Sequence, residues 1–282
     1  MLFVALTAAL ATSAPEVQPA TSRLSFLEQN YFAAGFDFEN QVKFRLSVKV
    51  DLVPSLAPWT VHFAYSQVSL WNLFSAGQSA PFVESNYAPE LFLTRWFVPE
   101  IGARMDGLRL EYLRLGFEHR SNGQDRGSRS LNRPYVEARV SHSGLLARAE
   151  CPLPDVDQRT RRCPGAFVGS RLTLFAPIAS AENPDLVDYL GVFEWSVFGG
   201  WSRPQSFGQA QLELYLRKGM SSELDRGAVR VMLTVEPSFI FPGLPQLVDL
   251  YAEYYGGYGE VLGFYDQPRQ AFRAGLAFGG LP

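Results

Sequence analysis

The chain has 282 residues, with 25 Lys and Arg against 28 Asp and Glu and a formal net charge of −3. This nearly balanced charge gives no indication of a nucleic-acid partner, and no run approaches the ~18–20 apolar residues of a membrane helix. Aromatic residues make up 14% of the sequence, including 22 Phe and 12 Tyr. Such a composition is typical of a β-sandwich, a β-barrel, or a membrane barrel with aromatic girdles.

The apolar stretch from Leu2 to Ala11 has the character of the hydrophobic region of a secretory signal. Small residues at Ala11 and near Ala14 offer cleavage sites. We therefore expect a signal peptide over residues 1–14 and one exported domain over residues 15–282. Export without a helical anchor leaves the periplasm, the medium or the outer membrane as the destination.

Residues 42–52 alternate strictly between apolar and polar side chains, which is the pattern of a half-buried β-strand. The even positions carry Val42, Phe44, Leu46, Val48, Val50 and Leu52, and the odd positions carry Lys43, Arg45, Ser47, Lys49 and Asp51. The same alternation returns over residues 211–217, 229–236 and 272–278. A soluble sandwich would also alternate, so this pattern predicts strands without identifying their surroundings.

Two further features favour a transmembrane barrel. Several alternating segments reach about ten residues, the length of a tilted membrane strand, whereas soluble strands more often stop near five or six. Short Pro/Gly turns also alternate with longer polar loops, as in outer-membrane barrels. The short turns are residues 53–58, 201–206 and 241–246, and the longer loops are residues 72–89, 121–131 and 256–269.

The sequence thus predicts an all-β fold, a single antiparallel transmembrane β-barrel of about twelve strands, an even number that returns both termini to the periplasmic side. The predicted strands are residues 30–38, 42–52, 59–71, 90–98, 107–121, 131–141, 170–178, 187–201, 206–218, 228–240, 247–257 and 268–280. Leu145–Cys151 competes with residues 170–178 for the seventh place. We favour 170–178 and a periplasmic location for the segment that carries the cysteines.

The two cysteines, Cys151 and Cys163, flank a polar segment over residues 152–162. After export we expect them to form a disulfide that closes a small loop. A metal site is the weaker alternative, because no histidine lies near them in sequence.

His119 and Ser121 stand two residues apart at the end of the alternating segment 107–121. On a β-strand such residues point to the same face, so the imidazole can take the proton of the hydroxyl. They share their parity with Leu113, Leu115 and Phe117, and Tyr112, Arg114, Glu118 and Arg120 take the other parity. The apolar parity of a membrane barrel faces lipid, so the pair should point outward, where ester bonds of lipids are within reach.

Several motifs surround this pair. They are His119-x-Ser121-Asn122-Gly123, Ser128-Arg129-Ser130-x-Asn132-Arg133, Tyr65-Ser66-Gln67 with Trp71, Ser79-x-Pro81-Phe82-x-Glu84-x-Asn86-Tyr87-x-Pro89-Glu90-Leu91-Phe92-Leu93, Asn183-Pro184-Asp185 with Tyr189, and Tyr255-x-Gly257-Tyr258-Gly259-Glu260. Over about residues 30–280 the chain resembles the outer membrane phospholipase A family, calcium-dependent barrel enzymes of Gram-negative outer membranes.

The resemblance implies a role for each matching residue of the pair's surroundings. Ser121 would be the nucleophile, His119 the general base, and Asn132 the residue that orients the imidazole without adding charge. The Gly123 amide would donate a hydrogen bond to the oxyanion, with calcium-bound water as the second donor.

Calcium takes oxygen ligands, and the loop after the serine offers Gln124, Asp125 and Ser128. By resemblance, Ser128 and the Gln124 carbonyl would be ligands, and Ser79 would contribute a carbonyl from the neighbouring subunit of a homodimer. Gln67 matches a polar residue at that dimer interface.

The chain departs from the family pattern in two places. The spacing from Ser121 to Asn132 is one residue shorter, and residues 141–167 form an insertion without a counterpart. We expect this insertion, with its cysteines, to be a solvated loop. A basic loop that contacts anionic headgroups is the alternative, since it carries Arg159, Arg161 and Arg162.

The sequence therefore predicts a calcium-dependent outer-membrane phospholipase A, active as a homodimer, that hydrolyses acyl esters of membrane glycerophospholipids and lysophospholipids. A non-catalytic outer-membrane barrel, either a narrow channel or an inactive family member, is the main alternative. An exported soluble esterase built on a sandwich is a weaker one. His62, opposite in parity to Phe63 and Tyr65, is predicted to face the barrel lumen.

Overall fold

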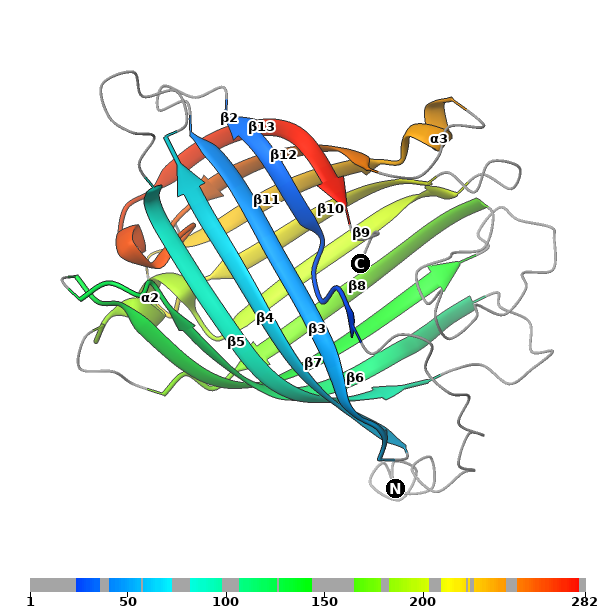
Figure 1. The fold of residues 1–282 in the computed structure, drawn as a ribbon, viewed down its shortest axis with the longest axis horizontal. Coiled ribbons are helices and arrows are strands. Elements are labelled where there is room, and N and C mark those ends of the chain that lie inside the picture. Colours follow the sequence, from blue (N-terminus) through cyan, green and yellow to red (C-terminus); the bar gives the residue numbers. More distant parts are fainter. Residues whose placement is uncertain are drawn as a thin grey trace.

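The computed structural model describes residues 24–35, 41–56, 58–72, 82–97, 107–125, 127–143, 165–178, 183–202, 209–221, 223, 226–241 and 248–278. One antiparallel sheet curls round and closes into a barrel, with short helices at its two ends (Figure 1). The strands are β1 (Leu24–Ser25), β2 (Asn30–Gly35), β3 (Val42–Leu56), β4 (Trp59–Trp71), β5 (Phe82–Trp96), β6 (Gly107–Ser121), β7 (Ser130–Ser143), β8 (Gly165–Phe175), β9 (Phe193–Ser202), β10 (Gln209–Lys218), β11 (Gly227–Val235), β12 (Asp249–Gly257) and β13 (Arg269–Phe278). The helices are α2 (Leu186–Leu190), α3 (Pro237–Ile240) and the 3-10 helix η2 (Leu262–Phe264). No helix among these residues is long and apolar enough to cross a membrane.

Pairing of β3 with β4 closes the barrel. The sheet runs β1-β3-β2-β13 and then back through consecutive strands to β4, which also pairs with β3. β1 and β2 pair with successive stretches of one side of β3, at residues 49–50 and 42–45, so they share one strand position. The thirteen strands thus occupy twelve positions, and the predicted twelve-stranded antiparallel barrel is confirmed. A closed barrel leaves no strand edge unpaired.

The barrel is apolar outside and charged inside, the reverse of a soluble protein. Lys43, Glu253 and Arg273 are buried in the interior. Large apolar side chains remain exposed all round the wall, including Leu46 and Val48 on β3, Leu212 and Leu214 on β10, and Phe272 and Leu276 on β13. This polarity is that of a barrel whose outer wall contacts lipid. The predicted apolar and polar faces of residues 42–52 are therefore correct.

Ion pairs line the barrel interior. Lys43 Nζ lies 2.7 Å from Glu253 and 3.1 Å from Glu260. Arg273 Nη1 bonds the same two carboxylates, at 3.2 Å and 2.6 Å. Each of these buried charges has opposite charges beside it, which offsets the cost of removing it from water.

The segment between β1 and β2 also enters the interior. Its Glu28 pairs with Arg45 at 3.3 Å and with Arg171 at 3.1 Å. His62 faces the lumen as predicted: it is fully buried, and its Nδ1 lies 2.7 Å from Asp51 Oδ1. Both His62 and Glu28 therefore bond to charged groups inside the barrel.

Residues 82–89, predicted as part of a loop, instead form the first half of β5. Glu84 and Asn86 point inward and are buried. In sequence this polar run resembles a loop, because a soluble core would not accept its polar side chains. The polar interior of this barrel accepts them, so the run forms a strand.

At the other end of the sheet, β3 continues to Leu56 through irregular pairing after Asp51, so the turn predicted over residues 53–58 is shorter.

Two predicted strands contain helices. Residues 187–201 were predicted as one strand, but the chain forms α2 first and β9 begins at Phe193. Leu186 and Leu190 lie one helical turn apart and are both buried, and Gly191 ends the helix at a φ of 67°. The strand predicted over residues 228–240 stops at Val235 because Pro237, which has no N–H for the sheet, begins α3.

The seventh predicted strand starts earlier than expected. β7 ends at Ser143 and β8 begins at Gly165, so residues 176–178 leave the barrel wall. Because the strands alternate in direction, both ends of the insertion lie at the barrel end where β13 finishes at Phe278. The signal peptide predicted over residues 1–14, the competing strand 145–151, Ser79, Cys151 and Cys163 lie outside the described residues.

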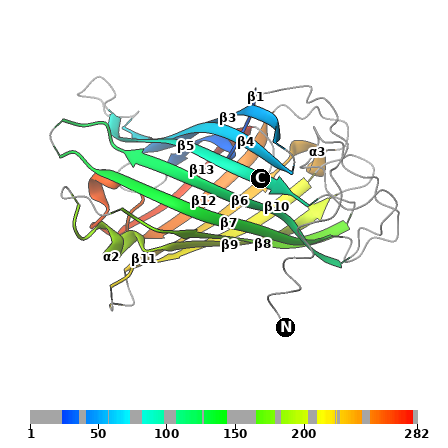
Figure 2. The ribbon, with the colours of Figure 1, turned by 90° about the horizontal axis from the view of Figure 1, so that it is seen from below.

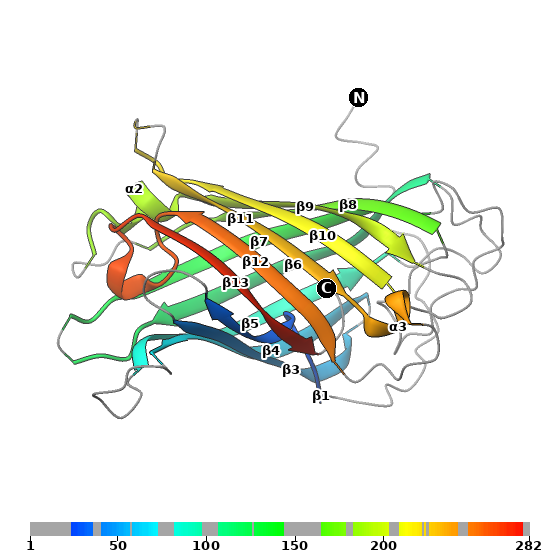
Figure 3. The same ribbon diagram turned by 90° about the horizontal axis from the view of Figure 1, so that it is seen from above.

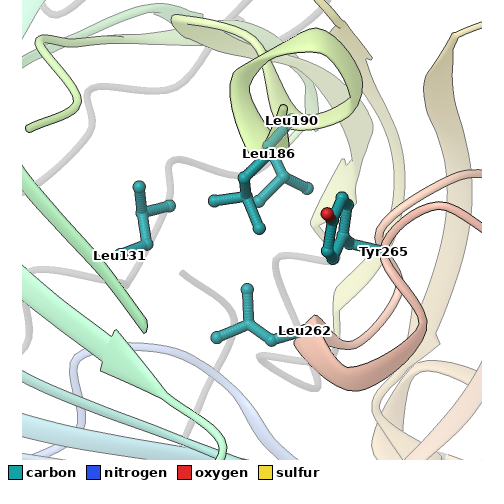
Figure 4. Close-up of a cluster of buried hydrophobic side chains, with 5 residues drawn as sticks. All are labelled: Leu131, Leu186, Leu190, Leu262 and Tyr265. Carbon is teal, nitrogen blue, oxygen red and sulfur yellow. The ribbon is translucent and has the colours of Figure 1, made fainter. Parts of the chain in front are cut away.

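The opposite end of the barrel, where β6 stops at Ser121, carries α2 and η2, while α3 lies at the far end (Figures 2 and 3). A cluster of apolar side chains joins α2 and η2 to the start of β7. Its members are Leu131, Leu186, Leu190, Leu262 and Tyr265 (Figure 4), and we call it the mouth cluster. Tyr265 also donates a hydrogen bond from its hydroxyl to Asp185. The segments that close this end are therefore packed against the strand that follows the His–Ser pair.

Candidate active site

The pairing of β6 with β7 brings the predicted site residues together. His119 stands directly across from Asn132, and Ser121 across from Ser130. The His119 Nδ1 lies 2.8 Å from Asn132 Oδ1. Since an amide oxygen only accepts, Nδ1 must carry the proton in this bond, and Nε2 is left as the nitrogen that can accept one. Ser121 lies two residues further along β6 on the same face of the strand.

The group lies on the outer wall of the barrel. Leu115 and Phe117, which share the parity of His119, are 40% and 43% exposed, whereas Glu118 is 8% exposed. The orientation predicted from the sequence is therefore correct. The site lies at the end of β6, where the strand leaves the apolar belt.

The second residue of the loop after Ser121 is Gly123, where a side chain would strain the backbone. Gly123 has a φ of 64°, in the left-handed region that favours glycine. A Cβ on it would lie 2.8 Å from Cε2 of Tyr87. Tyr87 is the cross-strand partner of Ser121 on β5. The ring thus packs directly against the backbone whose amide was predicted to hold the oxyanion.

Asn122 closes this loop on itself. Its side chain is 3% exposed; Nδ2 donates to the Gly127 carbonyl at 3.0 Å, and Oδ1 accepts from the Arg129 amide at 3.0 Å. Its own amide donates to the Arg129 carbonyl at 3.1 Å. Sequence reasoning gave Asn122 no role of its own, although an Asn-Gly pair after a strand is a turn signal.

The candidate calcium ligands Gln124, Asp125 and Ser128 all lie in this loop, on the exposed or half-exposed side of it. Among the described residues no three His, Cys, Asp or Glu side chains cluster as a metal site. Calcium, however, also takes backbone and amide carbonyl oxygens as ligands, and one carboxylate with amide and hydroxyl oxygens is the donor set this loop presents. The residues present therefore fit a calcium ion, with Ser79 lying outside the described residues.

Gln67 lies on the same outer wall, two strands from Ser121. It stands across from Tyr87, which in turn stands across from Ser121. The Gln67 side chain accepts from the Tyr65 hydroxyl at 3.2 Å and donates to Ser69 Oγ at 3.0 Å. Polar side chains therefore run across an otherwise apolar wall beside the site.

A closed antiparallel barrel with an apolar outer wall and a charged interior defines the class of membrane β-barrel proteins, and His119, Ser121 and Asn132 lie at one end of that wall. The chain matches the family model described as phospholipase A1 over residues 12–278. It belongs to this family, and it is an outer-membrane β-barrel.

Relatives and solved structures agree with this assignment. The chain is 29% identical over 227 residues to phospholipase A1 of Salmonella typhimurium, covering 79% of this chain and 64% of the relative. It is 28% identical over 227 residues to phospholipase A1 of Escherichia coli K12, again covering 79% and 64%. The matched stretch thus spans about half to two thirds of the curated relatives' length.

Two structures share the fold. Outer membrane phospholipase A of Escherichia coli superposes with a TM-score of 0.69 at 22% identity, over 93% of this chain and 100% of that one. The Salmonella typhi outer membrane phospholipase dimer with bound calcium gives a TM-score of 0.69 at 22% identity, over 94% and 95% of the two chains. Both establish the barrel architecture of this chain.

Proposed function

We propose that the chain is a calcium-dependent outer-membrane phospholipase A that hydrolyses acyl esters of glycerophospholipids and lysophospholipids at Ser121. The observation that carries the proposal is the bond of 2.8 Å between His119 Nδ1 and Asn132 Oδ1, with Ser121 beside it on the outer wall. Membership of the phospholipase A1 family supports this reaction class.

In the proposed reaction, Ser121 Oγ attacks the acyl carbonyl carbon while His119 Nε2 takes the hydroxyl proton. The tetrahedral intermediate collapses to an acyl-serine ester as the imidazolium returns the proton to the leaving glycerol oxygen. Water then attacks the ester while His119 Nε2 accepts its proton, and the imidazolium returns that proton to Ser121 Oγ as the fatty acid leaves. Asn132 holds the imidazole in the tautomer that both steps need.

The Gly123 amide would hold the oxyanion of that intermediate, in a loop already ordered by Asn122. Gln124, Asp125 and Ser128 would hold a calcium ion in the same loop, together with Ser79 from a neighbouring subunit. When bound, the ion would supply positive charge near the developing oxyanion.

A homodimer accounts for the polar residues on the outer wall. Gln67, bonded to Tyr65 and Ser69, would face the partner and not lipid, because an amide in contact with hydrocarbon lacks partners for its remaining hydrogen-bonding capacity. The Salmonella typhi structure is of a dimer with bound calcium, which supports extending both features to this chain.

The test replaces Ser121 with alanine and measures release of fatty acid from phospholipid in detergent micelles, with calcium and with a chelator. Wild type should be active only with calcium, and Ser121→Ala should be inactive in both. Ser170→Ala is the matched control: Ser170 is on the wall of β8, where its hydroxyl accepts from Trp195 at 2.8 Å. Undiminished, calcium-stimulated hydrolysis by Ser121→Ala would refute the proposal.

A further inference from the structure

Glu84 joins three segments at the end of the barrel where the site lies. It comes from β5 and is 3% exposed. Its Oε1 accepts hydrogen bonds from Asn86 Nδ2 and from the Gly263 amide, each at 2.9 Å. Its Oε2 accepts from Gln124 Nε2 at 3.1 Å. One buried carboxylate therefore links the barrel wall, the η2 segment and the loop that follows Ser121.

The η2 segment is a firm support for this carboxylate. Asn86 Oδ1 accepts from the Leu262 amide at 2.8 Å, so two neighbouring backbone amides of η2, at Leu262 and Gly263, are both bonded by side chains of β5. On its other side Leu262 belongs to the mouth cluster (Figure 4). Polar bonds and apolar packing thus hold η2 against the barrel.

Glycine at position 263 is required for this contact. A Cβ on Gly263 would lie 2.6 Å from Oε2 and 2.9 Å from Oε1 of Glu84, so the carboxylate would have to shift. Any larger residue would push the carboxylate away from Gln124. The position of the Glu84 carboxylate therefore depends on glycine at residue 263.

We propose that Glu84 is a positioning residue for the active-site loop, acting through Gln124. Asn122 ties the loop to itself, whereas Glu84 ties the loop to β5 and η2. By fixing the side-chain amide of Gln124, Glu84 holds in place the backbone that carries the Gly123 amide and the candidate calcium ligands. Hydrogen-bond donors stabilise a transition state only when they are held in place beforehand.

This inference rests on the proposed function for its catalytic consequence. In Glu84→Gln, one carboxylate oxygen becomes an NH₂ group that cannot accept the bond from Gln124 while the other still serves η2. Loss of a bond to a charged group predicts that kcat falls by about tenfold to a hundredfold. The calcium concentration for half-maximal activity should rise, and KM for lipid should change little because Glu84 faces away from the lipid side. Gly263→Ala should reproduce these effects.

Glu90→Gln is the matched control, because Glu90 lies on the same strand and the same buried face but accepts its bond from Tyr135, at 2.6 Å. A double-mutant cycle that combines Glu84→Gln with Gln124→Ala tests whether Glu84 acts through the side chain of Gln124. If Glu84 acts through Gln124, the second substitution adds little to the first; if Glu84 only supports the fold, the two effects multiply.

A readout independent of hydrolysis is amide hydrogen exchange of the peptide that spans residues 122–129. Exchange should be faster in Glu84→Gln and Gly263→Ala than in wild type and in Glu90→Gln, while all four keep the heat-modifiable gel mobility of a folded barrel. A wild-type protein that does not hydrolyse phospholipid refutes the proposed function alone. Unchanged exchange of this peptide in Glu84→Gln, or multiplicative effects in the cycle, overturn the role of Glu84.

Discussion

Replacing Asn132 with alanine measures how much an uncharged residue that orients the histidine contributes to the proposed site of Ser121, His119 and Asn132. The structure offers one bond to lose, the 2.8 Å contact from His119 Nδ1 to Asn132 Oδ1. A neutral hydrogen bond contributes about 0.5–1.5 kcal/mol net, which corresponds to a fall in kcat of about two- to tenfold. Loss of the Asp of a Ser-His-Asp triad costs about 10⁴-fold because a negative charge and the correct tautomer go together. We therefore expect Asn132→Ala to remain clearly active.

The assay is the initial rate of fatty-acid release at saturating calcium, with Ser121→Ala as the baseline. Folding of Asn132→Ala is checked by its gel mobility before and after heating. A fall in kcat beyond about a thousandfold would contradict the reasoning, because orientation through one neutral bond cannot supply so much. An unchanged kcat would equally contradict it, since His119 would then not depend on Asn132 for its orientation.

Two other changes test the loop and the interior. Gly123→Ala should lower kcat by about a hundredfold or more without unfolding the barrel, because a Cβ at φ 64° and 2.8 Å from the ring of Tyr87 would displace the amide. Full activity would contradict this displacement. Burial alone would raise the pKa of Glu260, but the positive charges of Lys43 and Arg273 hold this pKa below its usual value. The contribution of the Glu260 carboxylate to the free energy of unfolding is therefore complete above about pH 4.5. That contribution is lost as the pH falls through the lowered pKa. Unfolding by denaturant between pH 3 and 7 should show this loss, and Glu260→Gln should reduce it; an equal loss in the variant would assign it to other carboxylates.

The barrel could be predicted because apolar and polar residues alternate regularly along its strands. Residues 42–52 alternate without exception, and a closed antiparallel barrel is the membrane solution for such strands. The polar start of β5 could not be predicted in the same way. Glu84 and Asn86 are buried, yet in sequence they are polar residues between prolines, and only the presence of a polar interior turns such a run into a strand.

The site was predictable where it depends on local geometry or on resemblance. The i, i+2 relation of His119 and Ser121 follows from the pleat of one strand, and the contact with Asn132 follows from pairing of adjacent strands. The hydrogen bond from the Gly263 amide to Glu84 joins residues 179 positions apart, and no pattern in the sequence predicts this contact. Asn122 escaped for a different reason: its bonds lie within one loop whose turn geometry the motif alone does not specify.

The outward position of His119 and Ser121 bears on how the kinetics of this protein should be expressed. Under the proposed function, a site on the lipid-facing wall meets its substrate by lateral diffusion within a film, so the relevant variable is the mole fraction of phospholipid in that film. Adding detergent at constant phospholipid should slow the reaction by dilution in two dimensions, although the bulk molarity of phospholipid is unchanged. In an undiluted bilayer the substrate surrounds the wall at its maximum density, and the rate is then set by the assembly of the site and by the chemical step.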